Sequence, residues 1–451
     1  MKKIISLILC ILLTGSLLSG CGGSDDAAAA APTASPTEAT KPIIPSVRYL
    51  NFQPELELAW EELAAAYTAD TGIPVTVTTE APDHWRQTLD TCLSGEDAPT
   101  LFQLVSPAAD DAWQPLCYDL SRTDAYEQLA DGAYALTEGD AALALPCHLE
   151  ATGIWVNKAL LAQAGFRPED ITSQAGLKTI ADAIAASAEP LPFAAFAFPG
   201  RQEVPMELAS VAIALEFQQK NLSEPSAFRG SALDGLHSLL KLLLDNGTQG
   251  GLQEFMEGKA IFCPGTSADW DTLSKVFGPE ELMLVPAFLD ETQAAGDPEE
   301  TTPEEETSPT EETAAEEAPE PQELCVGASR YWCVNPNAPE QDLDATLDFL
   351  DWCLATEEGT AALASLGYEL PYLPAPEYRN PFLPAPDTKG LTLRQDWAIP
   401  SRQWKAALEA ALEAYTAEPT TAHWARAAEV FSDYWAAEYA LTDPAEETGD
   451  A

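Results

Sequence analysis

Three residues with reactive or metal-binding side chains, Cys147, His148 and Glu150, lie close together in one apolar segment. Adjacent residues of a strand point to opposite faces, so Cys147 and His148 are poorly placed to act as a nucleophile and its base. The four histidines form no His-Glu-x-x-His string, and no Gly-x-Ser-x-Gly string occurs. The sequence therefore favours a protein that is not an enzyme, with a secreted hydrolase as the less favoured alternative.

Metal binding is a separate hypothesis, because His148 and Glu150 would share one face of their strand. These two side chains could supply two ligands of a transition-metal ion. The sequence shows no third ligand, so we expect neither a metal nor another cofactor. Metal capture remains a rival interpretation, and metal analysis of protein purified without added ion would test it.

The first part of the folded chain is predicted to alternate strands and helices. We expect strands over 47–52, 73–79 and 101–105, and helices that carry Leu56 to Tyr67 and Trp85 to Cys92. This order indicates an α/β fold with a parallel sheet covered by helices, whose ligands bind beyond the carboxyl ends of the strands. Asn51 and Gln103 stand at such ends and are therefore candidate ligand contacts.

The later part of the chain is predicted to be mostly helical. Apolar residues recur at helical spacing over 206–217, 233–244, 343–354, 404–415 and 424–435. The tryptophans of the last three stripes lie at interior spacing and are expected to belong to the core.

Apart from Cys10 and Cys21, seven cysteines remain, and they are expected to behave as small buried apolar residues. A disulfide between two of them is left open.

The amino terminus has the pattern of a secretory signal. Lys2 and Lys3 precede an apolar run from Ile4 to Leu18, and Leu18-Ser19-Gly20-Cys21 resembles the bacterial lipobox. We expect a signal peptide over 1–20, a lipid on Cys21, and a flexible linker over 21–45 that is rich in Ala, Pro, Thr and Ser. The protein is therefore expected on the outer face of the cell membrane.

The chain is strongly acidic, with a formal net charge of −51. Binding to nucleic acid needs a basic surface, so nucleic acid is excluded as an expected partner. Residues 290–324 hold 14 carboxylates and no Lys or Arg, which predicts a disordered insertion. A disordered tail is expected over 442–451.

Four strings, taken in order, resemble the extracellular solute-binding proteins of carbohydrate ABC transporters, the maltose-binding-like type of family 1. The strings are Tyr49 to Glu55, Leu145 to Lys158, Phe255 to Phe262, and Tyr331 to Asn335 with the helix that follows to Gly359. Val156 stands where the family usually has tyrosine.

This resemblance implies a two-lobed, periplasmic-binding-protein-like fold of type II, with a mixed, mostly parallel sheet in each lobe and a ligand cleft between the lobes. The expected lobes are 46–154 with 262–331, and 155–261 with 332–441, joined by hinges near 151–156, 259–262 and 331–335. The implied function is capture of a sugar or oligosaccharide by a monomer that delivers it to an ABC transporter permease. A ligand sensor, or a protein for a metal or another solute, is the alternative.

A sugar site needs aromatic plates for C–H faces and carboxylates or amides for hydroxyl groups. The resemblance places Glu150 at a cleft-facing glutamate of the family, and Tyr331 and Trp332 beside the last hinge. We expect Trp332 rather than Tyr331 to face the cleft, because neighbouring strand residues point apart. Trp270 follows a polar segment, 265–269, that is predicted to be a loop, and Asp269 at the end of this segment could accept a hydrogen bond beside it. Trp85 and Trp113 are weaker candidates.

Overall fold

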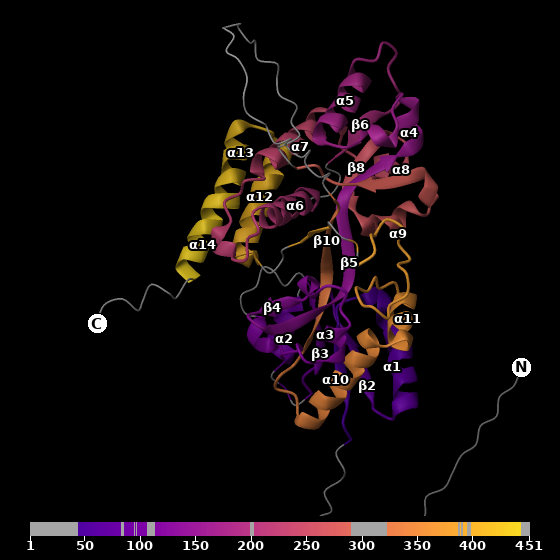
Figure 1. Cartoon of the computed structure of the whole chain (residues 1–451), viewed down its shortest axis with the longest axis vertical. Helices are drawn as coiled ribbons and strands as arrows, with labels where there is room; N and C mark the ends of the chain where they lie inside the picture. Colours follow the sequence, from indigo (N-terminus) through magenta and orange to yellow (C-terminus); the bar gives the residue numbers. More distant parts are fainter. Residues whose placement is uncertain are drawn as a thin grey trace, which may run out of the picture. The chain divides into compact units, whose positions relative to one another are not determined.

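The computed structural model describes residues 44–82, 85–93, 95, 97–105, 113–198, 203–289, 323–386, 388, 391–394 and 398–442. The predicted signal peptide, Cys21, most of the linker, nearly all of the acidic insertion and nearly all of the predicted tail therefore lie outside the described residues. The described part shows a mixed α/β architecture with a central sheet and helices packed on it (Figure 1).

The opening α/β unit matches the prediction. The strands are β1 (Val47–Asn51), β2 (Val75–Thr79) and β3 (Leu101–Val105), and the helices are α1 (Glu57–Thr71) and α2 (Trp85–Cys92). Both β2 and β3 pair with β1 in parallel register. Helix α1 ends at Gly72, whose φ of 75° is the left-handed cap conformation that glycine adopts without a steric penalty.

The sheet runs in the order β2-β1-β3-β10-β5-β8-β6-β7. Strand β5 (Ala141–Asn157) has 17 residues and pairs antiparallel with β10 (Cys325–Val334), β8 (Ala260–Thr266) and β9 (Leu282–Val285). The parallel part continues through β6 (Ala194–Ala197) and β7 (Gly247–Thr248). Two short strands, β4 (Leu136–Glu138) and β11 (Thr392–Leu393), pair with β5 and β10.

Most helices cover this sheet as expected from their apolar stripes. The longer ones are α5 (Gln174–Ala185), α6 (Val204–Gln219), α7 (Leu233–Asp245), α10 (Glu340–Ala355) and α12 (Arg402–Ala417). The shorter ones are α3 (Asp124–Glu127), α4 (Lys158–Gln163), α8 (Gly251–Met256), α9 (Trp270–Leu273), α11 (Glu357–Ser365), α13 (Thr421–Ala428) and α14 (Trp435–Thr442). None of the helices in the described part is long and apolar enough to cross a bilayer.

Two large hydrophobic cores divide the fold. The first core contains buried side chains from 47–151 and 326–383, and the second contains buried side chains from 154–289 and 398–435 together with Cys325. A smaller cluster around Trp155 and Phe255 belongs to the same stretch of chain as the second core. The chain thus passes from the first core to the second along β5, just after Ala151, and returns along β10, just after Cys325.

This division differs from the predicted lobes in two segments. Residues 262–289 pack with 154–261, and residues 332–383 pack with 47–151, the reverse of the predicted grouping. The reason is local packing: Trp332 contacts Tyr49 and Trp60, whereas Phe262 contacts Phe196. The crossing on β10 therefore lies at Cys325 and Val326 rather than in the predicted hinge at 331–335.

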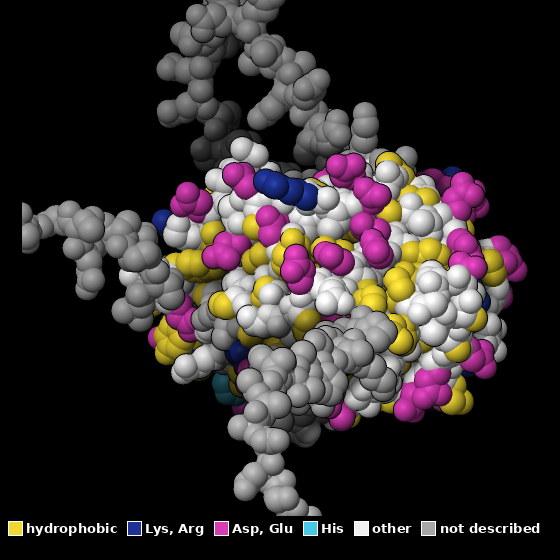
Figure 2. Space-filling view, turned by 90° about the horizontal axis from the view of Figure 1, so that it is seen from below, with side chains coloured by type: hydrophobic (Ala, Val, Ile, Leu, Met, Phe, Trp, Pro, Cys, Tyr) yellow, Lys and Arg dark blue, Asp and Glu magenta, His cyan; other side chains and the backbone are white. Residues whose placement is uncertain are grey.

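The predicted burial of cysteines is confirmed for the described residues. Cys92 is half-buried, and none of these seven described cysteines forms a disulfide; the buried ones are Cys117, Cys147, Cys263, Cys325, Cys333 and Cys353. Carboxylates dominate the charged groups of the face in Figure 2, where basic side chains are few, as the acidic composition requires.

Candidate functional site

A cavity of about 440 Å³ lies where the two cores meet. Its volume falls within the range of small-molecule sites. The wall includes Ala328 of the first core and both Met206 and Ile399 of the second. The polar and charged lining residues are Glu150, Thr152, Glu203, Glu207, Ser210, Thr266, Ser329, Arg394, Lys405, Glu409 and Glu413.

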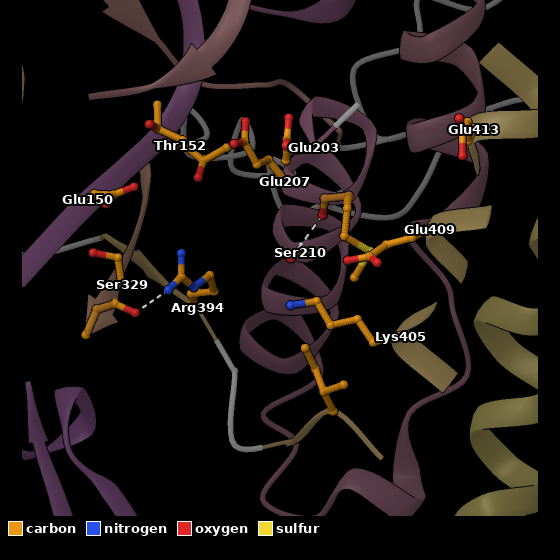
Figure 3. Close-up of a pocket in the computed structure, with 14 residues that line it drawn as sticks. Glu150, Thr152, Glu203, Glu207, Ser210, Ser329, Arg394, Lys405, Glu409 and Glu413 are labelled. Atoms are coloured by element: carbon orange, nitrogen blue, oxygen red, sulfur yellow. Dashed lines mark hydrogen bonds between the residues drawn. The ribbon is translucent and has the colours of Figure 1, made fainter. Parts of the chain in front are cut away.

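The floor of the cavity comes from the two strands that pass between the cores. Strand β5 contributes Glu150 and Thr152, two residues apart and therefore on one face, and Figure 3 shows both side chains leaving the same strand. Strand β10 contributes Ala328 and Ser329. Since β5 and β10 are hydrogen-bonded to each other, these side chains stand on a stiff base.

Ser329 occupies an irregularity in this pairing. Ala328 pairs with Leu149 and Arg330 with His148, so Ser329 is an extra residue on β10. Such a β-bulge changes the direction of a side chain, and bulges often occur beside functional sites. Ser329 Oγ is buried and has no hydrogen-bond partner among the described residues. The strand thus presents a buried hydroxyl group in the wall of the cavity.

Two helices of the second core form the opposite wall. Helix α6 carries Glu207 and Ser210, with Glu203 at its amino-terminal cap, and α12 carries Lys405, Glu409 and Glu413. Spacings of three and four residues place each set on one face of its helix. In Figure 3, Glu203 and Glu207 lie together at the start of α6, and Lys405 and Glu409 extend from α12.

Arg394 follows the short strand β11 and crosses β10 to reach the cavity. Its guanidinium group donates a hydrogen bond to the Ala328 carbonyl oxygen, drawn as a dashed line in Figure 3. A Cβ atom at Gly327 would lie 2.5 Å from Arg394 Cβ, so only glycine allows this close approach. The guanidinium group of Arg394 is thus held in the same wall of the cavity as the hydroxyl group of Ser329.

Of the nine candidate ligand contacts predicted from the sequence, Glu150 alone is among the described residues that line this cavity. Its side chain is half-buried on the first-core side of the point where β5 crosses between the cores. A carboxylate accepts hydrogen bonds at both oxygens, so Glu150 can bind two hydroxyl groups of one solute.

Trp332 is a core residue, and the expectation that it forms a stacking plate is wrong in this structure. It has 0% exposure, and its Nε1 donates to Tyr49 Oη at 3.0 Å. Edge contacts with Tyr49 and Trp60 and a tilted contact with Tyr368 leave no face for a ligand. Tyr331 is also buried, because β10 is a central strand covered on both sides.

Asn51 and Gln103 are fully buried and bind the protein itself. Asn51 donates to the Gln53 carbonyl oxygen at 3.0 Å, and Gln103 donates to Gln53 Oε1 at 3.0 Å and accepts from Phe52 N at 3.1 Å. These side-chain amides form hydrogen bonds with the residues that follow β1 rather than with a ligand. Asn51 ends β1 as predicted, whereas Gln103 lies in the middle of β3 and not at its end, and the hydrogen bonds of both side chains stay within the protein.

Asp269 and Trp270 likewise have structural partners. The predicted loop at 265–269 is a buried strand end followed by a short helical turn, in which Asp269 accepts from Thr266 N at 3.0 Å. Trp270 packs edge-on against Phe382, with ring centroids 5.0 Å apart. Trp85 is half-buried against the first core, and Trp113 is 5% exposed within it.

Cys147 and His148 of β5 are held in buried, structural surroundings. Burial raises the pKa of the Cys147 thiol to about 12, which keeps it protonated at neutral pH. Burial also lowers the pKa of His148, whose Nδ1 accepts from Glu369 N at 3.1 Å. Within the described ranges, no three His, Cys, Asp or Glu side chains are grouped as a metal site would need.

Comparison with known proteins agrees with this architecture. No curated protein matches the sequence of the chain. A family 1 extracellular solute-binding protein from Bifidobacterium longum subsp. infantis is similar in structure, with a TM-score of 0.61 at 14% identity over 87% of this chain and 99% of that chain. The cyclic α-maltosyl-1,6-maltose binding protein from Arthrobacter globiformis gives 0.60 at 15% identity over 87% and 98%.

A third similar structure is the maltose/maltodextrin-binding domain from Bdellovibrio bacteriovorus bound to maltotriose, with a TM-score of 0.58 at 14% identity over 88% of this chain and 100% of that chain. The fold is therefore the two-lobed, type II periplasmic-binding-protein-like fold. In sequence, residues 62–377 match the model of a family described as bacterial extracellular solute-binding protein. The match covers more than half of the chain, and the chain belongs to this family of bacterial extracellular solute-binding proteins.

Proposed function

We propose that the protein is an extracytoplasmic, lipid-anchored receptor that captures a sugar or oligosaccharide and delivers it to the permease of an ABC transporter. The observation that carries this proposal is the cavity between the two cores, lined by hydroxyl groups and carboxylates. The similar structures named above include proteins described as binding maltotriose and cyclic maltosyl-maltose, which supports a carbohydrate as the solute.

The cavity walls suggest how the solute is held. Glu150, Thr152 and Ser329 come from the strands between the cores, whereas Ser210 and the α12 side chains come from the second core. A solute that contacts both walls binds a closed arrangement better than an open one and therefore shifts the population towards closure. Closure would give the permease a surface that differs between the loaded and empty receptor.

Glu150 offers a direct test of the site. A panel of mono- and oligosaccharides is screened by thermal shift, since a ligand that binds only the folded state raises the melting temperature. The affinity of each hit is then measured by calorimetry. We expect dissociation constants of about 1 μM, which correspond to about −8 kcal/mol.

The variant Glu150→Gln removes the charge and one acceptor site but keeps the size of the side chain. We expect it to weaken binding at least about tenfold, the worth of one charge-assisted hydrogen bond. Glu138→Gln on β4 is the matched control, because Glu138 is exposed and does not line the cavity. A panel without any binding sugar, or equal affinity in the Glu150→Gln variant, would overturn the proposed site.

The lipid anchor is tested separately. In cells, Cys21→Ser is expected to move the protein from the membrane fraction to the soluble secreted fraction, because the thiol that accepts the lipid is lost. Retention of the Cys21→Ser variant in the membrane fraction would contradict the anchor. Loss of ATP-driven sugar uptake on deletion of an ABC permease of the same organism would test the transporter partner.

A further inference from the structure

The segment 368–383, called the clasp below, is anchored in the first core. Its buried side chains there are Tyr368, Leu370, Tyr372 and Leu383. Tyr372 Oη donates to the Pro146 carbonyl oxygen at 2.9 Å. The Glu369 carbonyl oxygen accepts from Leu149 N at 2.9 Å. The base of the clasp is therefore fixed to the first-core part of β5.

The tip of the clasp reaches the other half of the fold. Phe382 packs edge-on against Trp155 and Trp270, with ring centroids 4.7 and 5.0 Å apart. Trp155 belongs to the small cluster that lies with the second core, and the Phe382 and Trp270 rings pack against that cluster. Asn380 Nδ2 also donates to the Ser267 carbonyl oxygen at 2.7 Å. The clasp is thus a noncovalent link between the two halves.

A buried carboxylate holds the tip in shape. Glu369 is 7% exposed, and its two oxygens accept from Arg379 N at 3.2 Å and from Asn380 N at 2.9 Å. Asn380 Oδ1 in turn accepts from Phe382 N at 3.0 Å. These bonds connect the backbone beneath the Phe382 ring to the first core. The ring therefore moves with the first core rather than with the indoles that it contacts.

The clasp and the cavity lie on opposite faces of β5. Glu150 and Thr152 point to the cavity, and Trp155, an odd number of residues away from Thr152, points to the other face. The neighbouring strand β8 agrees with this division. Its Thr266, which pairs with Thr152, lines the cavity, and its Cys263, which pairs with Trp155, belongs to the small cluster. A rotation about the strands between the cores that narrows the cavity must therefore widen the gap beneath the clasp.

We propose that Phe382 opposes closure of the two halves and thereby sets the affinity for the solute. When the cavity closes, the ring leaves the two indoles, so part of the free energy of solute binding is used to separate them. Phe382 is a positioning residue, because it is not among the described residues that line the cavity. Its effect on affinity rests on the proposed function, whereas its effect on closure of the empty protein does not.

The test measures closure and affinity in the Phe382→Ala variant. Small-angle X-ray scattering of the empty variant should give a smaller radius of gyration than the unmodified protein, because closed forms become more populated. The affinity for a sugar found in the thermal-shift screen should rise at least about threefold, which is the worth of one aromatic pair. A residue with only a structural role would lower the affinity or leave it unchanged.

A second variant loosens the tip without removing the ring. Asn380→Asp removes the donor to the Ser267 carbonyl oxygen and keeps the acceptor for Phe382 N. It should shift scattering and affinity in the same direction as Phe382→Ala. Urea titration shows whether each variant remains folded and how much stability it loses.

Phe277→Ala is the matched control. Phe277 is also half-buried and packs against the same small cluster, with its ring centroid 5.9 Å from that of Phe255. Its truncation removes a comparable aromatic contact within the second half and none to the clasp. The control should therefore keep the scattering and the affinity of the unmodified protein.

The outcomes separate the two proposals. Unchanged scattering in both clasp variants would overturn the clasp, whichever sugar binds. Equal or weaker sugar binding by folded Phe382→Ala protein would overturn the link between the clasp and affinity. A panel in which no sugar binds would overturn the proposed function, while a smaller radius of gyration in the clasp variants would still support the clasp.

Discussion

Replacement of Trp332 by alanine should strongly destabilise the fold rather than remove a binding contact. The indole is fully buried, and it meets Tyr49, Trp60 and Tyr368 with centroid separations of 5.8, 5.6 and 6.1 Å. Its Nε1 donates to Tyr49 Oη at 3.0 Å. The substitution therefore creates a cavity in the first core and also leaves a buried phenol without its donor.

The magnitude follows from these two losses. Truncation of a large aromatic side chain in a core costs about 3–5 kcal/mol. A buried hydroxyl group that loses a partner costs a further 1–3 kcal/mol or so. The sum is a large part of a typical free energy of unfolding of about 5–15 kcal/mol. We expect the Trp332→Ala variant to unfold at much lower urea concentration, or to fail to accumulate.

A double-mutant cycle isolates the hydrogen bond. Trp332→Phe removes the donor, Tyr49→Phe removes the acceptor, and the double variant removes both. We expect each single variant to lose stability and the pair to be non-additive by about 0.5–1.5 kcal/mol. Urea titration followed by fluorescence and circular dichroism gives the free energies of unfolding. A Trp332→Ala variant with unchanged stability but lost sugar binding would refute the assignment to the core.

Three further predictions concern the backbone, a thiol and a histidine. Gly72→Val should lower the free energy of unfolding by about 1 kcal/mol or more in urea titrations, because a β-branched residue is strained at a φ of 75°. An unchanged midpoint would contradict the left-handed conformation at the end of α1. Cys147, whose pKa is raised to about 12 by burial, should resist alkylation at neutral pH until denaturant is added, and mass spectrometry of the labelled peptide would expose any rapid reaction. Burial lowers the pKa of His148 in the folded protein. Below the ordinary histidine pKa of about 6.5, the unfolded chain binds a proton at this residue and the folded protein does not, so the free energy of unfolding falls as the pH drops. His148→Asn should reduce this loss of stability between about pH 7 and 5, and identical pH profiles for the two proteins would disprove the contribution.

The local elements were predictable because short-range patterns determine them. The spacing of Leu56, Trp60, Leu63 and Tyr67 indicated α1, and the β-branched run at 73–79 indicated β2. Their parallel pairing followed from the alternation of strands and helices. These signals depend on neighbours within one turn or one strand, which a single sequence contains.

The site was less predictable because it depends on packing between distant segments. Alternation on β10 separates Tyr331 from Trp332, but it does not show that both side chains are buried. The bulge at Ser329 has no sequence signal, since it arises from the pairing with β5. Glu409 and Glu413 show a helical spacing, yet only the packing of α12 beside α6 brings them to the cavity.

The position of β10 in the sheet has a consequence for synthesis and export. Strand β3 lies between β1 and β10, so its second edge remains unpaired until the chain beyond residue 334 has been made. An apolar strand with an open edge is prone to pair with other chains. A ribosome-bound or partly exported chain would therefore need a chaperone over Leu101–Val105 for most of its translation, and moving the β10 segment forward by circular permutation should shorten that period.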